Sequence, residues 1–500
     1  MWVVWSFVVP FACALIAFLF PRGAVHAAMA AAVGILASSS LTVWGVARDG
    51  CRRLAMGGWT APLGIELRVD GLAALMLTAT AVVGTVSTIY ARGYLANHSA
   101  LERTQESGGS EDRHGHALFW PLWLSLWGSL NALFLSGDLF NLYVTLELIG
   151  LSSTALIGLA GVAPALIAAT RYLLVSLVGS FCYLAGVGLI YAACGTLDLA
   201  LIAGLVHGGP LPAVALALMT VGLLLKTALF PLHFWLPAAH GNAPAPVSAL
   251  LSALVVKAPY YLLLRLWIEV FAPVVTPGAA HFLGILGTGA ILWGSAQALL
   301  TDRVKPLVAY STVSQLGYLF LVFPLAREAG PGLFAWNGAA YFILSHAAAK
   351  ASMFLAAGTL LSATESDRLA HLDGISQCIP LPMFAFSIAG ASLIGLPPSG
   401  GFMAKWLLLK SALTGGQWGY LIVLLLGGLL TVTYVFRVFS RAFMYKPMVT
   451  ACHLLPRGMH WSPLVLSLIS LCLGLFASQV LSLLEAGSPW TRPGPGSGGP

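Results

Sequence analysis

The sequence predicts an all-α polytopic membrane protein with about fourteen transmembrane helices. Of its 500 residues, 59% are hydrophobic and only 8% are charged, and the mean hydropathy is +0.89. Apolar runs long enough to cross a bilayer, which takes about 20 residues, recur along the whole chain. A soluble domain of this composition would lack the polar residues that cover a soluble surface, so we exclude that class.

The apolar runs place the spans in order along the chain. The expected positions are 2–20, 24–46, 69–91, 118–136, 138–160, 170–194, 211–230, 244–268, 281–300, 304–325, 336–361, 383–411, 418–441 and 462–484. The first run has neither a basic region before it nor a small-residue cleavage site, so we interpret it as a retained helix.

A single membrane domain over residues 1–486 is expected, because no linker separates one group of spans from another. The polar segment 96–116 has charged residues around a Ser-Gly-Gly-Ser stretch and is predicted to be a mobile loop. The Pro- and Gly-rich tail, 487–500, is predicted to be disordered.

The net charge of +7 forms no basic stripe, so nucleic-acid binding is not expected. Counted by alternate loops, twelve Lys and Arg residues lie opposite the termini and seven lie on the side of the termini. The positive-inside rule therefore predicts that both termini lie on the outer face of a bacterial-type inner (plasma) membrane.

The seven cysteines are scattered, mostly within apolar runs, with no C-x-x-C pair. We interpret them as small buried hydrophobic residues. No cofactor, metal centre or iron–sulfur cluster is expected.

Charged residues inside the apolar runs are the main clue to function. A charge near the middle of a bilayer costs at least about 2.5–3.5 kcal/mol, so such residues are typical of ion or proton pathways. The run near residue 147 contains a glutamate, and the others contain lysines: Glu147, Lys226, Lys257, Lys350, Lys405 and Lys410. Lys410 lies near the end of its span and is expected to extend toward the headgroups.

Two spans are predicted to be broken. The seventh runs from Lys226 into a segment bounded by Pro231 and Pro237, and the twelfth contains Pro397 and Pro398 followed by two glycines. Proline removes a backbone donor and interrupts a helix. Irregular backbone at membrane depth is tolerated only where protein or a wet cavity surrounds it, so the breaks point to a transport site.

Several motifs occur together with these charges. They are Gly137 to Tyr143 leading to Glu147; Pro231 to Leu251 followed by Lys257 and Tyr260; Asp302 to Lys305 leading to Ala309 through Tyr318; Ser345 and His346 with Lys350; and Gly400 to Phe402 with Lys405. In this order the chain closely resembles the antiporter-like subunits shared by respiratory complex I, membrane-bound hydrogenases and Mrp-type cation/proton antiporters. The residues of the first motif, Gly137 to Tyr143, and the presence of Phe342 are most similar to the D-type subunit of Mrp antiporters.

The resemblance implies two inverted five-helix repeats, about 118–268 and 281–441, with broken seventh and twelfth helices. Position by position, it implies a pair of Glu147 with Lys226, a connecting Lys257, relay residues at His346 and Lys350, and a terminal proton-exchanging Lys405. His233 and His240 flank the first break and are either relay members or caps of the broken helix.

The predicted function is therefore proton translocation along this buried axis, as a subunit of a multisubunit cation/proton (Na⁺/H⁺) antiporter. The expected partners are other membrane subunits, H⁺ and Na⁺. The alternative is the proton-pumping subunit of a complex I-like NADH:quinone oxidoreductase or a membrane-bound hydrogenase, with no redox site of its own. A free-standing solute carrier and an inert helical scaffold are weaker alternatives, because neither requires a lysine axis.

Overall fold

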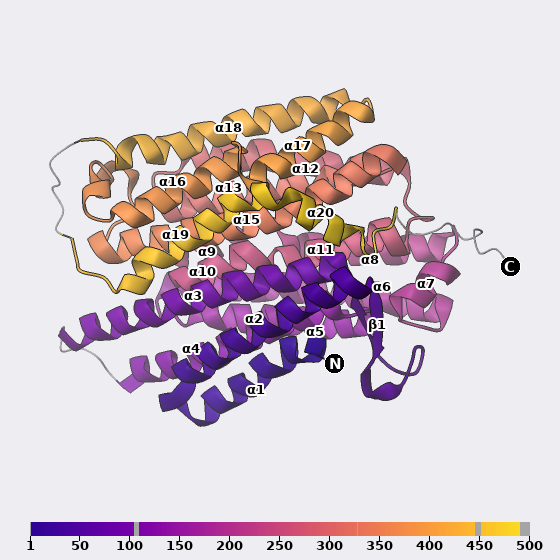
Figure 1. The fold of residues 1–500 in the computed structure, drawn as a ribbon, viewed down its shortest axis with the longest axis horizontal. Coiled ribbons are helices and arrows are strands. Elements are labelled where there is room, and N and C mark those ends of the chain that lie inside the picture. The colour runs from indigo at the N-terminus through magenta and orange to yellow at the C-terminus, as the bar shows by residue number, and fades with distance from the viewer. Residues whose placement is uncertain (1, 105–109, 328, 446–451, 491–500) are drawn as a thin grey trace.

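A computed structural model describes residues 2–104, 110–327, 329–445 and 452–490. Its helices lie side by side along the long axis of the molecule (Figure 1). Among the described residues, thirteen helices are long and apolar enough to cross a membrane. They match thirteen of the predicted spans, and the remaining span, 383–411, is divided into α16 (Pro380–Ile394) and α17 (Gly400–Thr414). The predicted all-α membrane fold is confirmed.

The N-terminal helices pack against one side of the core. They are α1 (Trp5–Leu19), α2 (Ala24–Asp49) and α3 (Gly71–Thr104), and an antiparallel hairpin of β1 (Arg52–Ala55) and β2 (Glu66–Val69) joins the last two. α3 continues to Thr104 and α4 (Ser110–Leu135) begins at Ser110, so helix enters the segment 96–116 from both ends. Residues 105–109 of that segment, and 491–500 of the tail, lie outside the described residues.

The central helices form two groups. The first comprises α4, α5 (Leu139–Gly158), α6 (Ala163–Cys194), the short α7 (Leu199–Leu205), α8 (Pro210–Thr227), α9 (Leu236–Asn242), α10 (Ala245–Leu250), the π-helix η4 (Leu251–Val255), α11 (Lys257–Arg265) and the π-helix η5 (Leu266–Val270). The second comprises α12 (Pro277–Leu300), α13 (Val304–Phe320), α14 (Val322–Leu325), α15 (Ala329–Thr364), α16, α17 and α18 (Trp418–Ala442). α19 (Arg457–Cys472) and α20 (Ala477–Glu485) follow.

A pair of isolated β-bridges relates the two groups. Asp138 bridges to Asp198 where α5 begins and α6 has ended, and Arg303 bridges to Arg368 where α13 begins and α15 has ended. Each bridge residue after the long helix lies four positions beyond the end of that helix, at Cys194 and Thr364. The same local construction therefore occurs twice, which sets α5 and α6 in correspondence with α13 and α15.

Both predicted helix breaks are present. α8 ends at Thr227 and helix resumes at Leu236, whereas α16 ends at Ile394 and α17 begins at Gly400. Ala228 and Gly395 terminate the first halves in the left-handed conformation, and Ser399 caps α17 by accepting a hydrogen bond from the Phe402 N–H at 3.2 Å. The prolines that follow each end prevent the helix from continuing.

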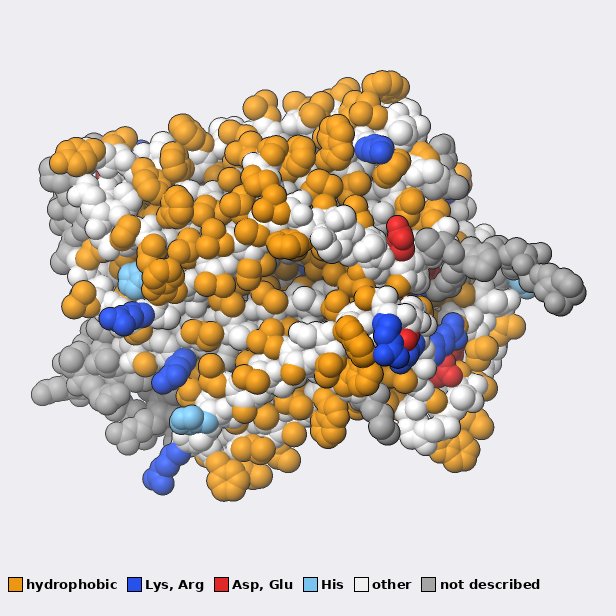
Figure 2. Space-filling view, in the orientation of Figure 1, with side chains coloured by type: hydrophobic (Ala, Val, Ile, Leu, Met, Phe, Trp, Pro, Cys, Tyr) orange, Lys and Arg blue, Asp and Glu red, His pale blue; other side chains and the backbone are white. Residues whose placement is uncertain are grey.

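The exterior is that of a membrane protein. Hydrophobic side chains cover most of the face in Figure 2, and Lys and Arg side chains gather toward the two ends of the helices. Within each of the spans 245–270 and 330–364, an 18-residue apolar stretch is buried throughout, so α11 and the middle of α15 form the centre of the core. Side chains within these buried stretches are removed from the protein surface.

One sequence expectation is wrong. The cysteines were expected to be small buried hydrophobic residues, but Cys378 and Cys452 form a disulfide across a separation of 74 residues. It joins the connection between α15 and α16 to the connection that precedes α19. Pairing over such a separation depends on helix packing, which cysteine spacing does not reveal.

Candidate functional site

Glu147 and Lys226 form an ion pair between α5 and α8. The distance between Lys226 Nζ and Glu147 Oε1 is 3.1 Å, and the lysine side chain is only 7% exposed. Two serines of the intervening α6 complete the group: Lys226 donates a hydrogen bond to Ser176 Oγ at 2.8 Å, and the Ser180 hydroxyl donates to Glu147. Each charge therefore has both a counter-charge and a hydroxyl partner.

The break in the seventh span positions Lys226 at the end of a half-helix. Lys226 occupies the last turn of α8, where unpaired carbonyls favour a cation. Trp235, the last residue of the break, donates its indole N–H to the Leu225 carbonyl at 3.0 Å. The lysine is thus held near the irregular backbone rather than directed to lipid.

Lys257 begins α11, and one residue separates it from the end of a π-helical turn. Its ammonium donates to the Ser252 carbonyl at 2.5 Å, and Ser252 belongs to η4. A π-turn displaces carbonyls from regular helical pairing and is frequent at functional sites. The Ser252 hydroxyl also pairs with the Thr312 hydroxyl of α13 at 2.9 Å, which connects Lys257 to the next helix.

Lys350 and His346 share one face of α15, four residues apart. Lys350 is fully buried and donates to the Val308 carbonyl at 3.1 Å and to the Ser311 hydroxyl. Neither ring nitrogen of His346 has a hydrogen-bond partner among the described residues, although the charges of Lys257, Lys350 and Lys405 all act on it. His346 therefore lies within electrostatic range of three lysines, with its nitrogens available to water.

Lys405 follows the second break and contacts the end of the preceding half-helix. Its ammonium donates to the carbonyls of Leu393, at 2.7 Å, and Ile394, at 3.2 Å, which are the last residues of α16. The negative end of a helix dipole favours a cation there. The ammonium also lies 4.6 Å from the ring centroid of Tyr318, a cation–π contact.

The two histidines near the first break differ. His233 stacks on Phe230 at 5.6 Å, and no hydrogen bond or ion pair joins it to the lysines in the described part of the chain. His240 is fully buried, stacks on Phe354 at 5.1 Å, and feels the charges of Lys257, Lys305 and Lys350. The structure thus places His240 among the charged residues and His233 apart from them.

The predicted site residues fall into two sets. Glu147 and Lys226 form the first, and the second contains His240, Lys257, His346, Lys350 and Lys405. Within the described residues, no direct hydrogen bond or ion pair joins the two sets. Lys410 is exposed and lies over the Phe334 ring at 4.1 Å, and Asp138 caps α5 by accepting from the N–H groups of Phe140 and Asn141.

Sequence reasoning missed the hydroxyl groups that bind these charges. Ser176, Ser180, Ser252, Ser311 and Thr312 all contact a site residue or its immediate partner. Their one signal in the sequence is a polar residue within an apolar helix, and small hydroxyls are common there for packing alone. Lys305 is one of the twelve basic residues that the count by alternate loops places in connections, but its side chain is buried.

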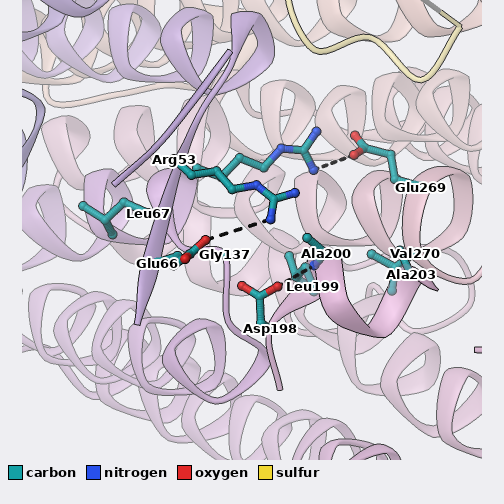
Figure 3. A pocket seen from close by; sticks show the side chains of 11 residues that line it. Arg53, Glu66, Leu67, Gly137, Asp198, Leu199, Ala200, Ala203, Glu269 and Val270 are labelled. Atoms are coloured by element: carbon teal, nitrogen blue, oxygen red, sulfur yellow. Dashed lines mark hydrogen bonds and ion pairs between the residues drawn. The ribbon is translucent and has the colours of Figure 1, made fainter. Parts of the chain in front are cut away.

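A second charged cluster, also missed, lies at the end of the helices that carries the β-hairpin. Arg68 contacts Asp70 at 2.9 Å and Glu269 at 2.5 Å, and Arg265 contacts the same two carboxylates at 2.6 Å each. The cluster borders a cavity of about 80 Å³, where Arg53 and Glu66 approach from the hairpin and Asp198 from the start of α7 (Figure 3). It ties β2 to the buried α11 and η5.

The charged cluster lowers the pKa of Asp70. Burial alone would raise the pKa, but the guanidinium groups of Arg265 and Arg68 and the backbone N–H of Ala73 outweigh burial and lower it to about 2. At the beginning of α5, burial raises the pKa of Asp138 against the lowering effect of its two backbone hydrogen bonds.

The fold and these buried charges define a membrane protein of the antiporter-like class, with two broken helices and an interior set of lysines. Comparison with known proteins agrees. Residues 136–431 match the family described as "NADH:quinone oxidoreductase/Mrp antiporter, TM", and the chain belongs to this family.

The relatives include members of two kinds of assembly. The chain is 35% identical over 495 residues to NADH-quinone oxidoreductase subunit N of Desulforudis audaxviator, covering 95% of this chain and 94% of that one. It is 29% identical to the D-type subunit of the Na(+)/H(+) antiporter of Bacillus subtilis, covering 90% and 88%. Among solved structures, a chain of the Mrp complex from a Dietzia species matches with a TM-score of 0.85, 25% identity and 98% coverage of both chains.

Proposed function

We propose that this chain is the proton-translocating subunit of a multisubunit cation/proton antiporter of the Mrp type, with Na⁺ as the exchanged cation. The ion pair between Glu147 and Lys226 carries the proposal, because it places a titratable pair within two spans of a membrane protein. A lysine can release its proton when its counter-charge is withdrawn, whereas an arginine would remain charged. The pair therefore acts as an electrostatic switch.

The proposed path begins at this pair and continues through water to Lys257. From there the hydroxyls of Ser252, Thr312 and Ser311 lead toward Lys350 and His346. Lys405 is the last group, and it exchanges its proton with one face of the membrane. His346 serves as a waypoint because imidazole accepts and donates protons near neutral pH.

A redox-linked complex is the second candidate, in which this chain carries protons while other subunits carry electrons. The match to NADH-quinone oxidoreductase subunit N over 95% of the chain favours it. The sequence of the motif from Gly137 to Tyr143 and the presence of Phe342 favour the antiporter. In both candidates the chain works beside other membrane subunits.

For orientation, we propose that both termini face outward. The beginning of α1 and the end of α20 lie toward the end of the molecule that carries the β-hairpin (Figure 1), and fewer basic residues lie on that side. The end with Arg303 and Arg368 would then face the cytoplasm.

The test replaces Lys226 by Ala and by Arg in the chain expressed with its neighbouring subunits. Proton flux is measured in everted membrane vesicles with a pH-sensitive dye, and it is normalised to the amount of inserted chain. We expect both variants to insert and to lose flux, while Lys410→Gln stays at the wild-type level. Wild-type flux in Lys226→Arg would refute the switch. Dependence of the flux on added Na⁺, or on a redox substrate, separates the two assemblies.

A further inference from the structure

A buried lysine outside the predicted axis lies between that axis and one end of the molecule. Lys305, the second residue of α13, is only 4% exposed, and its ammonium donates to the Ala243 carbonyl at 2.7 Å. Ala243 caps the end of α9, the helix that contains His240. Among the described residues this ammonium has one hydrogen-bond acceptor, a backbone carbonyl, and burying an ammonium with so little compensation is costly, so a role beyond packing is expected.

On one side, Lys305 reaches the exposed end of the helices. The charges of Asp367 and Arg303 both act on it. Arg303 pairs with Asp367 at 2.7 Å, and the side chain of Arg303 is 54% exposed whereas that of Asp367 is 3% exposed. The Oδ2 atom of Asp367 has no hydrogen-bond partner among the described residues. This carboxylate therefore has a free acceptor beside a group that reaches solvent.

On the other side, Lys305 approaches the axis through His240. Both ring nitrogens of His240 lack a partner among the described residues, although the ring is fully buried. The charges of Lys305, Lys257 and Lys350 act on this ring together. Buried polar groups without a protein partner are typically satisfied by water. The imidazole thus lies within electrostatic range of Lys305 and of the two axis lysines, with its nitrogens available.

We propose that Lys305 carries protons between the molecular end at Arg303 and Asp367 and the buried axis, with His240 as the intermediate. This route rests on the proposed function, because it supplies the axis with the protons that the axis moves. The Lys305 ammonium gives one proton to a neutral ring nitrogen of His240, directly or through one water. His240 passes a proton to the neutral amine of Lys350 or Lys257, and a proton taken up from bulk solvent and relayed by water beside Asp367 reprotonates Lys305.

The alternative role for Lys305 is structural, as a fixed cation that holds the Ala243 carbonyl. Arginine distinguishes the two roles, because it retains the charge and the hydrogen-bond donors but does not release a proton. Glutamine can donate to the carbonyl without a charge. If the role is structural, Lys305→Arg conducts like the wild type.

The experiment uses the full chain with its neighbouring subunits in everted vesicles, and flux is normalised to the inserted chain. We expect Lys305→Arg, Lys305→Gln and Lys305→Cys to lose flux by about a hundredfold or more, since a positioned proton-transfer group contributes roughly 10²–10⁴-fold. Treating vesicles that already contain Lys305→Cys with 2-aminoethyl methanethiosulfonate restores a primary ammonium and should restore flux. This arm separates chemistry from folding, and the treated wild-type chain and Lys410→Gln are the controls.

The outcomes are distinct for the two proposals. Wild-type flux in Lys305→Arg, or failure of the aminoethyl group to restore flux in the labelled cysteine variant, would overturn the route. If Lys226→Ala abolishes flux while the Lys305 variants conduct normally, the axis stands and the route is wrong. If Lys226→Ala itself conducts normally, the proposed function fails.

Discussion

Glu147→Gln tests the electrostatic basis of the switch, since it removes the counter-charge of Lys226 and keeps the size of the side chain. At the observed 3.1 Å and an effective dielectric constant near 20, the lost Coulomb energy is about 5 kcal/mol. The Glu147 side chain is 20% exposed, so water recovers part of this energy. A remaining loss of about 1.4–3 kcal/mol corresponds to a ten- to more than hundredfold shift in the protonation equilibrium of Lys226.

We therefore expect proton flux in everted vesicles to fall by about ten- to a hundredfold in Glu147→Gln. Glu147→Asp keeps the charge but shortens the side chain, and it should retain part of the flux. The amount of inserted chain, measured by immunoblot, controls for assembly. Wild-type flux in Glu147→Gln across the pH range would refute the reasoning, because the charge of Glu147 would then not control Lys226.

Three further predictions concern the charged cluster around Asp70 and the aromatic residues near Lys405. Arg265→Met leaves Asp70 and Glu269 with one guanidinium, so the purified chain should lose about 3–5 kcal/mol of stability in a thermal unfolding assay. Replacement of the exposed Arg48 by Met is the control. An equal loss of stability in that control would contradict the importance of the charged cluster. Because the folded-state pKa of Asp70 is lowered to about 2 from its ordinary 3.8, its contribution to stability is present above about pH 4 and is lost as pH falls toward 2. Asp70→Asn should lack this acid-dependent loss, and retention of the full loss would exclude Asp70 as its source. Phe342 stacks between His346 and Tyr318, at ring distances of 5.7 and 5.6 Å, so Phe342→His should raise flux by adding a proton carrier there, while a similar rise in Phe342→Leu would attribute the gain to space alone.

The sequence predicted the spans and both breaks because each depends on local composition. An apolar run of about 20 residues has few alternatives to a bilayer span, and proline interrupts a helix wherever it packs. The charges of Lys226, Lys257 and Lys405 were visible for the same reason, since each interrupts an apolar run. No such local signal marks Lys305, which lies at a span boundary beside Asp302 and Arg303 and is buried because α9 packs against α13.

The partners of the charged groups depend on contacts between distant helices and could not be predicted. In the sequence Arg265 is only one of the basic residues counted for the orientation of the spans, but it pairs with Asp70 across 195 residues. Ser176 and Ser180 have the same local context as a packing serine, and only the approach of α5 and α8 assigns them to the ion pair. Burial of an arginine or a serine is a property of the tertiary fold, so helix periodicity carries no information on it.

The two β-bridges show that one scaffold supports two different environments for charge. Ser176 and Ser180 lie 22 and 18 residues before the bridge residue Asp198, and His346 and Lys350 lie at the same separations before Arg368. By the same count from Asp138 and Arg303, Glu147 corresponds to Thr312. The second group thus replaces a carboxylate and two hydroxyls by a hydroxyl, an imidazole and an ammonium.

This exchange changes what holds each lysine. Lys226 has a carboxylate, whereas Lys257, Lys350 and Lys405 donate to backbone carbonyls of Ser252, Val308 and Leu393. A carbonyl carries only a partial charge, so it stabilises an ammonium less than a carboxylate does. Burial away from water raises the cost of charging each of these three amines. Outside the ion pair, the axis should therefore bind fewer protons than it has lysines. At least one of these lysines is then a neutral amine, and a neutral amine can accept an arriving proton.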